Sequence, residues 1–105
     1  MPATWLAQRL AIDPAMIDAM RRDGELVAVR APGSTDWFYP SWQLEDGQPL
    51  HGIPRVVRAA REAGIDEGRL YTILTARRGL HGEGHVYELL REGREDDVVE
   101  LVRAG

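Results

Sequence analysis

Apolar residues near the start of the chain recur at the spacing of a short helix. Leu6, Ala7 and Leu10 share one face of this helix, and Thr4 is its expected N-cap. Ile12 then closes a tight corner before a second helical pattern begins. Ala7 is small enough to let two helices approach closely where they cross. This arrangement is typical of a helix-turn-helix.

The second pattern has clear start and stop signals. Asp13 can accept hydrogen bonds from free backbone N–H groups, and Pro14 suits the first position of a helix. The helix presents Ile17 and Met20 to the core. It is expected to end at Gly24, because glycine readily adopts the left-handed conformation that often follows a helix.

The period of the pattern changes from helical to alternating after this helix. Residues 26–30 alternate as a strand, residues 32–36 are rich in turn-forming types, and residues 37–39 form a second β-prone run. The pattern predicts a hairpin, or wing, and Pro40 should limit strand pairing beyond it. The nearby aromatic residues Trp37, Tyr39 and Trp42 are expected to cover the helix-turn-helix and join it to the second half of the chain; the alternative is an exposed surface for a partner.

The second half of the chain has the apolar spacing of helices. Residues 45–54 contain two glycines and two prolines and are expected to form a connector. Helices are predicted over residues 55–63, 67–75, 86–91 and 95–103, with a glycine-rich loop over residues 77–84. Asp66 is the expected N-cap of the second of these helices, and the acidic start of the last one suits the helix dipole.

These elements predict a mainly α fold with a small β-hairpin. A winged helix-turn-helix is expected over residues 1–44, followed by a small helical domain over residues 45–105. A chain of 105 residues is long enough for one compact domain, or for two subdomains that share a core.

The first of these parts has the spacing of a known DNA-binding module. Its key positions are Ala7, Leu10, Ile12, Ile17, Gly24, Leu26 and Arg30, and residues 4–40 resemble the winged helix-turn-helix of MerR-like and excisionase-like proteins. The resemblance implies that the second helix enters the major groove of double-stranded DNA. The residues expected to face the groove are Pro14, Ala15, Asp18 and Ala19. The expected phosphate contacts are Arg21, Arg22 and Arg30, with Arg9 in support. We expect a homodimer, because one short recognition helix reads few bases.

The charge of the chain opposes this interpretation. The net charge is −4, and residues 1–50 contain four arginines against seven Asp or Glu. DNA-binding surfaces are usually basic, because neutralisation of phosphates supplies most of the non-specific affinity. Asp18 would repel phosphate unless it accepted a hydrogen bond from a cytosine amine. The alternative is a protein-interaction module whose helix-turn-helix is only a scaffold and does not bind DNA.

Several segments of the second half share the order and spacing of another family. They are residues 39–44, 47–50 and 52–54, Leu74 with Thr75, the Leu80-x-Gly82 step, residues 88–93, and the acidic start and apolar pattern of the last helix. Together, residues 39–103 resemble the Xre/MbcA/ParS-type toxin-binding domain of bacterial antitoxins. The resemblance implies a toxin partner, often of the NAD-consuming RES class, and repression of the protein's own operon.

The toxin-binding candidates lie in the glycine-rich loop and on the carboxy-terminal helix. The loop candidates are Arg77, Arg78, Glu83 and His85. The alternative for Arg77 and Arg78 is an ordinary solvated loop.

No catalytic residue, cofactor or metal is expected. His81 and His85 lie four residues apart around a Glu, but Gly82 and Gly84 disfavour the helix that a zincin-type site needs. The chain has no cysteine, and its serines lie in turns without an evident base. No apolar run approaches the roughly 20 residues of a membrane span, and no signal peptide is visible. We therefore expect a soluble cytoplasmic protein rather than an enzyme.

Overall fold

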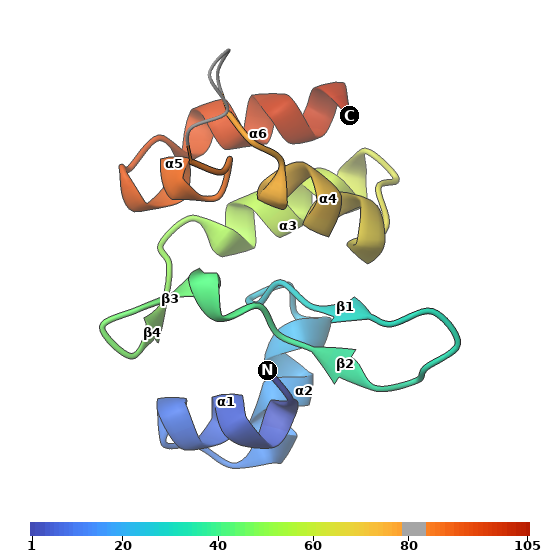
Figure 1. The fold of residues 1–105 in the computed structure, drawn as a ribbon, viewed down its shortest axis with the longest axis vertical. Coiled ribbons are helices and arrows are strands. Elements are labelled where there is room, and N and C mark those ends of the chain that lie inside the picture. Colours follow the sequence, from blue (N-terminus) through green and yellow to red (C-terminus); the bar gives the residue numbers. More distant parts are fainter. Residues whose placement is uncertain (79–83) are drawn as a thin grey trace.

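The computed structural model describes residues 1–78 and 84–105 (Figure 1). The helices in these residues are α1 (Ala3–Leu10), α2 (Pro14–Arg22), α3 (Ile53–Glu62), α4 (Glu67–Thr75), α5 (Glu88–Arg91) and α6 (Glu95–Ala104). Two antiparallel hairpins pair β1 (Val29–Arg30) with β2 (Trp37–Phe38) and β3 (Leu44–Glu45) with β4 (Gln48–Pro49). The protein is therefore mainly α with small β-hairpins, a winged helix-turn-helix followed by a helical part. Among the described residues, no helix has the length and apolar character needed to cross a membrane.

The helix-turn-helix and its wing lie at one end of the long axis, and α5 and α6 lie at the other (Figure 1). The first helix begins one residue before Thr4, so the prediction of Thr4 as N-cap is wrong. Pro2 is the N-cap instead, because the segment before α1 is held in place by a bridge to Phe38. The helix ends at Leu10, and the next residue, Ala11, adopts a left-handed conformation with φ 57°. The next residue, Ile12, then donates its N–H to the carbonyl of Ala7 (3.0 Å) and closes the corner as predicted.

Both ends of α2 agree with the prediction from the sequence. The Asp13 side chain accepts a hydrogen bond from the N–H of Ala15 (2.8 Å), and Pro14 is the first helical residue. Gly24 has φ +79° and follows the end of the helix. It is also in close contact with α3, because a Cβ atom at Gly24 would lie 3.1 Å from Nη1 of Arg61. The end of α2 is thus packed directly on the second half of the protein.

The two strands of the wing are shorter than the sequence predicted. In the hairpin, Val29 pairs with Phe38 and Arg30 with Trp37. The amino terminus extends its base, because the backbones of Met1 and Tyr39 exchange two hydrogen bonds, each 2.8 Å long. Residues 26–28, predicted as part of a strand, pair with no strand among the described residues.

Residues 26–28, here called the junction segment, lie between two hydrophobic clusters. Leu26 and Ala28 belong to the cluster of the helix-turn-helix, whereas Val27 belongs to the cluster formed with α3, α4, α5 and α6. The fully buried side chain of Gln43 forms the hydrogen bonds that a neighbouring strand would otherwise make with Val27. Its Oε1 accepts from the N–H of Val27 (2.8 Å), and its Nε2 donates to the carbonyl of Val27 (2.9 Å).

The predicted role of the aromatic residues is confirmed. Tyr39 is buried in the cluster of the helix-turn-helix, and Trp37 packs against the same cluster. Trp42 packs against the other cluster, where its ring stacks on Tyr87 with centroids 4.5 Å apart. These three residues therefore connect the helix-turn-helix with the helices of the second half.

The second hairpin was not predicted, because residues 45–54 were expected to form only a connector. Asp46 and Gly47 both have positive φ, 52° and 76°, which is the backbone pattern of a tight hairpin turn between β3 and β4. The Asp-Gly pair was an available signal for it. The boundary between residues 44 and 45 stays a prediction.

The helices of the second half begin and end near their predicted limits. In α4, the Asp66 side chain accepts from the N–H of Arg69 (2.8 Å), as expected of an N-cap. Helices α3 and α6 pack together through fully buried valines, which are Val56, Val98 and Val102. Helix α5 is shorter than predicted and starts at Glu88, because residues 86–87 form a turn.

Candidate nucleic-acid interface

The first turn of α2 has the exposure that a recognition helix needs. Ala15 and Met16 are exposed there, while Ile17 is fully buried and fixes the opposite face in the core. Asp18 and Ala19, which were predicted to face outward, are half-buried. The accessible surface of this first turn is therefore small and apolar.

The negative charge of Asp18 is compensated by two arginines that follow it on the helix. Its carboxylate forms ion pairs with Arg21, three residues on, and with Arg22 at 3.4 Å. The hydrogen bond from Arg21 holds the pKa of Asp18 below its usual range. The repulsion that Asp18 was expected to exert on phosphate is thus offset within the helix itself.

Arg21 is partly buried and held by contacts within the protein. Its side chain is only 19% exposed, and its guanidinium lies 4.3 Å from the ring centroid of Trp37. Arg30 lies over the same ring at 4.6 Å. The indole thus contacts one arginine from α2 and one from the wing, an arrangement stabilised by cation–π attraction. Arg21 is better placed to fix the wing against α2 than to reach a phosphate.

The remaining predicted DNA contacts are accessible. Arg22 has a side chain that is 65% exposed, and Arg30 and Arg9 are exposed as well. Asp18, Arg21, Arg22 and Arg30 therefore form one connected cluster around Trp37, and Arg9 stands on α1, which packs against α2.

The sequence did not single out two arginines of α3. Arg61 donates a hydrogen bond from Nη2 to the carbonyl oxygen of Arg21 (3.1 Å), so it touches the last turn of α2. Arg58 lies one turn earlier on α3 and is exposed. Their spacing of three residues could have indicated a shared basic face, because residues three apart lie on the same side of a helix.

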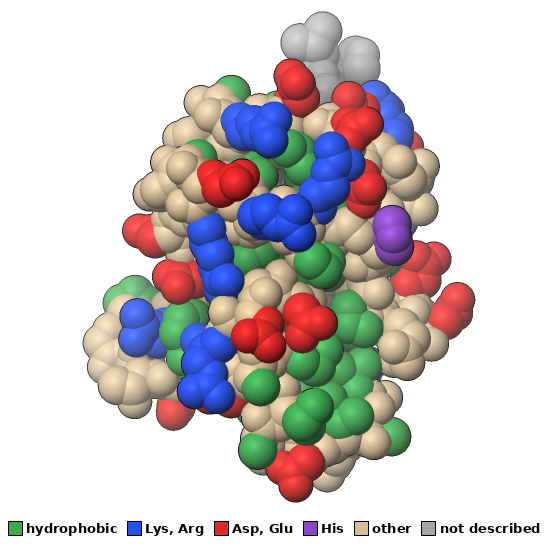
Figure 2. Space-filling view, turned by 180° about the vertical axis from the view of Figure 1, so that it is seen from behind, with side chains coloured by type: hydrophobic (Ala, Val, Ile, Leu, Met, Phe, Trp, Pro, Cys, Tyr) green, Lys and Arg blue, Asp and Glu red, His purple; other side chains and the backbone are tan. Residues whose placement is uncertain are grey.

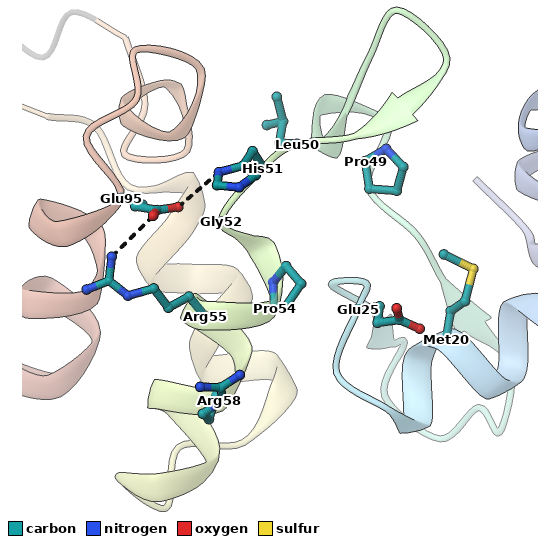
Figure 3. Close-up of a pocket in the computed structure, with 10 residues that line it drawn as sticks. All are labelled: Met20, Glu25, Pro49, Leu50, His51, Gly52, Pro54, Arg55, Arg58 and Glu95. Atoms are coloured by element: carbon teal, nitrogen blue, oxygen red, sulfur yellow. Dashed lines mark hydrogen bonds and ion pairs between the residues drawn. The ribbon is translucent and has the colours of Figure 1, made fainter.

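An open cleft of about 480 Å³ separates α2 from α3 (Figure 3). Met20 and Glu25 form one wall, and Pro54 and Arg58 lie across from them. At the rim, Glu95 pairs with Arg55 (3.2 Å) and with His51 (3.6 Å).

The loop residues predicted to bind a protein partner have contacts within the protein. Arg78 pairs with Glu92 (2.6 Å), and Arg77 forms a β-bridge with His85. Nδ1 of His85 lies 2.8 Å from the carbonyl oxygen of Thr75. Glu83, like Leu80, His81 and Gly82, lies outside the described residues. Within residues 1–78 and 84–105, no group of three or more potential metal ligands is present.

Comparison with known proteins shows a shared fold. No family model matches the chain, and no curated protein matches its sequence. Among solved structures, the NMR structure of Rv2175c superposes on it with a TM-score of 0.81. The alignment covers 98% of this chain and 77% of that chain, at 18% sequence identity. The likeness therefore extends across both the helix-turn-helix and the helices of the second half.

Proposed function

We propose that the protein is a small bacterial DNA-binding transcriptional regulator of the antitoxin type. In this proposal the helix-turn-helix binds operator DNA, and the carboxy-terminal helices bind a protein partner such as a toxin of the RES class. The observation that carries the DNA-binding part is the exposed first turn of α2 beside a wing that is fixed by the stack of Arg21, Trp37 and Arg30.

Each part of this arrangement has a role in binding DNA. Ala15 and Met16 offer a slender, apolar surface that fits into a major groove and can contact thymine methyl groups. Arg22 at the end of the helix and Arg30 on the wing would hold the phosphates on either side. The wing keeps its position because Trp37 connects it to α2. A homodimer would place two such helices in successive grooves.

The test is binding to the DNA upstream of the protein's own gene, followed over a series of salt concentrations. The double variant Arg22→Gln, Arg30→Gln should bind more weakly and with a salt slope lower by about 1.8, since each lost phosphate contact removes about 0.9. Arg91→Gln, which removes one positive charge from α5 at the other end of the molecule, should leave the slope unchanged.

Lack of binding by the unaltered protein at low salt would contradict the proposal. It would favour the alternative in which the helix-turn-helix is a scaffold for protein interaction. One observation favours that alternative: the partly buried Arg21 is held by Asp18 and Trp37.

The proposed binding of a protein partner is supported by apolar side chains exposed on the second half. Tyr71 on α4 is 37% exposed and Leu101 on α6 is 45% exposed. The variant Leu101→Asp should weaken neutralisation of a RES-class toxin encoded beside the gene, measured as recovery of NAD cleavage. Trp5→Asp, at an exposed apolar residue of α1, is the matched control. Equal neutralisation by both variants would contradict this role for α6.

A further inference from the structure

The arginines on α3 lie against the end of α2, beyond the residues used in the proposed DNA contact. Arg61 bonds to the carbonyl of Arg21, and Arg58 and Arg61 border a hollow of about 200 Å³ together with Asp23 and Gly24. The hollow therefore joins the first residues after α2 to the exposed face of α3.

The charges of these two arginines are largely uncompensated. Arg58 has no hydrogen bond or ion pair with any of the described residues. Arg61 bonds to a neutral carbonyl, so it keeps its full charge. Arg55, one turn before Arg58, differs from both because it is paired with Glu95 and Asp96. Positive charge on α3 is thus concentrated at the end that meets α2.

The positive charge on α3 lies next to positive charge at the end of α2. Arg58 and Arg61 are separated by about 4.5 Å along the axis of α3, at a rise of 1.5 Å per residue. Arg22 belongs to the last turn of α2, directly before Asp23 of the hollow. Figure 2 shows one face of the molecule on which basic side chains are spread from its upper to its lower part, with acidic side chains among them. We call Arg22, Arg58 and Arg61 the arginine band.

We propose that the arginine band binds the sugar-phosphate backbone of double-stranded DNA and extends the contact from the helix-turn-helix onto α3. This inference rests on the proposed function. Guanidinium groups suit the role, because they present paired N–H donors that match two phosphate oxygens. Contacts to phosphate position a protein on DNA without reading its sequence. The second half of the chain thus contributes affinity and orientation to DNA binding, while α2 provides selectivity.

The test compares Arg58→Gln with the unaltered full-length protein, using the upstream duplex and a random duplex of the same length. The slope of log K against log salt should fall by about 0.9, because one phosphate contact is lost. Affinity should fall by the same factor on both duplexes, since the contact carries no sequence information. The double variant Arg58→Gln, Arg61→Gln should lower the slope by about 1.8.

Two further variants separate a local contact from a general effect of charge. Arg91→Gln makes the same change in net charge on α5, at the opposite end of the molecule from the helix-turn-helix, and should keep the slope and the affinity of the unaltered protein. Asp23→Asn removes an acidic group from the hollow and should tighten binding to both duplexes. Thermal melting of each variant checks that the fold is retained.

The outcomes distinguish the two proposals. If the unaltered protein binds DNA while Arg58→Gln keeps its slope, the arginine band is not a contact and the proposed function stands. An equal loss with Arg91→Gln would also overturn the band, because net charge alone would then explain the effect. Lack of DNA binding by the unaltered protein would overturn both proposals.

Discussion

Replacing Gln43 by methionine should destabilise the fold, although the two side chains are similar in length and volume. The Gln43 side chain is fully buried and forms two hydrogen bonds to the backbone of Val27, 2.8 and 2.9 Å long. Methionine fills the space but cannot pair with either group. The N–H and the carbonyl of Val27 would then be buried without partners.

The magnitude can be worked out from these two groups. A buried donor or acceptor left without its partner costs about 1–3 kcal/mol. Two such groups, offset in part by the apolar contacts of the new side chain, give a loss of about 2–4 kcal/mol. A domain of this size has a total stability of about 5–15 kcal/mol, so the loss is a large share of it.

Equilibrium unfolding in urea, followed by circular dichroism, measures this loss. At an m-value of about 2 kcal/mol/M, in the middle of the range for small domains, the midpoint for Gln43→Met should fall by roughly 1–2 M. Gln8→Met, at an exposed glutamine of α1, should change the free energy of unfolding by less than about 0.5 kcal/mol. Similar midpoints for the two variants would refute the assignment of these hydrogen bonds as a major source of stability.

A second variant tests the direction of the hydrogen bonds. In Gln43→Glu, only a protonated carboxyl can donate to the carbonyl of Val27 as the amide does. Folding should therefore raise the pKa of this carboxyl above its ordinary value of about 4.3. The variant should be most stable below that pH and should lose stability as the pH rises through the raised pKa. A stability that did not fall as the pH rises would contradict this geometry.

Two other substitutions concern the backbone at the helix corner and a buried hydroxyl. Ala11→Gly should stabilise the protein by about 0.5–1 kcal/mol and raise Tm, because Ala11 has φ 57° and glycine adopts this conformation more readily than alanine. The control Ala15→Gly, within α2, should lower Tm. A lower Tm for Ala11→Gly would contradict this reasoning. Burial raises the pKa of Tyr39 above 10, so stability is intact below that pH and falls as the pH rises above it. Tyr39→Phe should reduce this alkaline loss in thermal melting, while Tyr71→Phe, at an exposed tyrosine, should retain it.

Local signals were sufficient where the structure depends on neighbouring residues. Asp13 with Pro14, and Asp66, mark the starts of α2 and α4, because an N-cap acts within three residues of itself. The second hairpin had a local signal too, since Asp46 and Gly47 provide the positive φ values of its turn. This hairpin could have been predicted from the sequence.

Other features depend on parts of the chain that are distant in sequence. The start of α1 is set by Phe38 on the wing, so Thr4 is not the N-cap despite its suitable side chain. Residues 26–28 pair with no strand in the described part of the chain, and the backbone of Val27 is bonded instead by the side chain of Gln43. A pattern read within a window of a few residues does not contain this information.

The same distinction applies to the candidate interface. The exposed Ala15 and Arg22 lie where the helical pattern placed them. Arg21 does not behave as expected, because its position depends on packing against Trp37. The contact of Arg61 with α2 requires that α3 dock beside Gly24, which is a property of the complete fold.

The alternation of the junction segment limits how this gene can change. Leu26 and Ala28 face one cluster and Val27 the other, so inserting or deleting a single codon here would turn each side chain toward the wrong cluster. Both halves would lose core residues in one mutational step. Length changes among descendants of this gene should therefore accumulate in the tip of the wing, at residues 31–36, and recombination that joins this helix-turn-helix to another helical domain should rarely yield a folded protein.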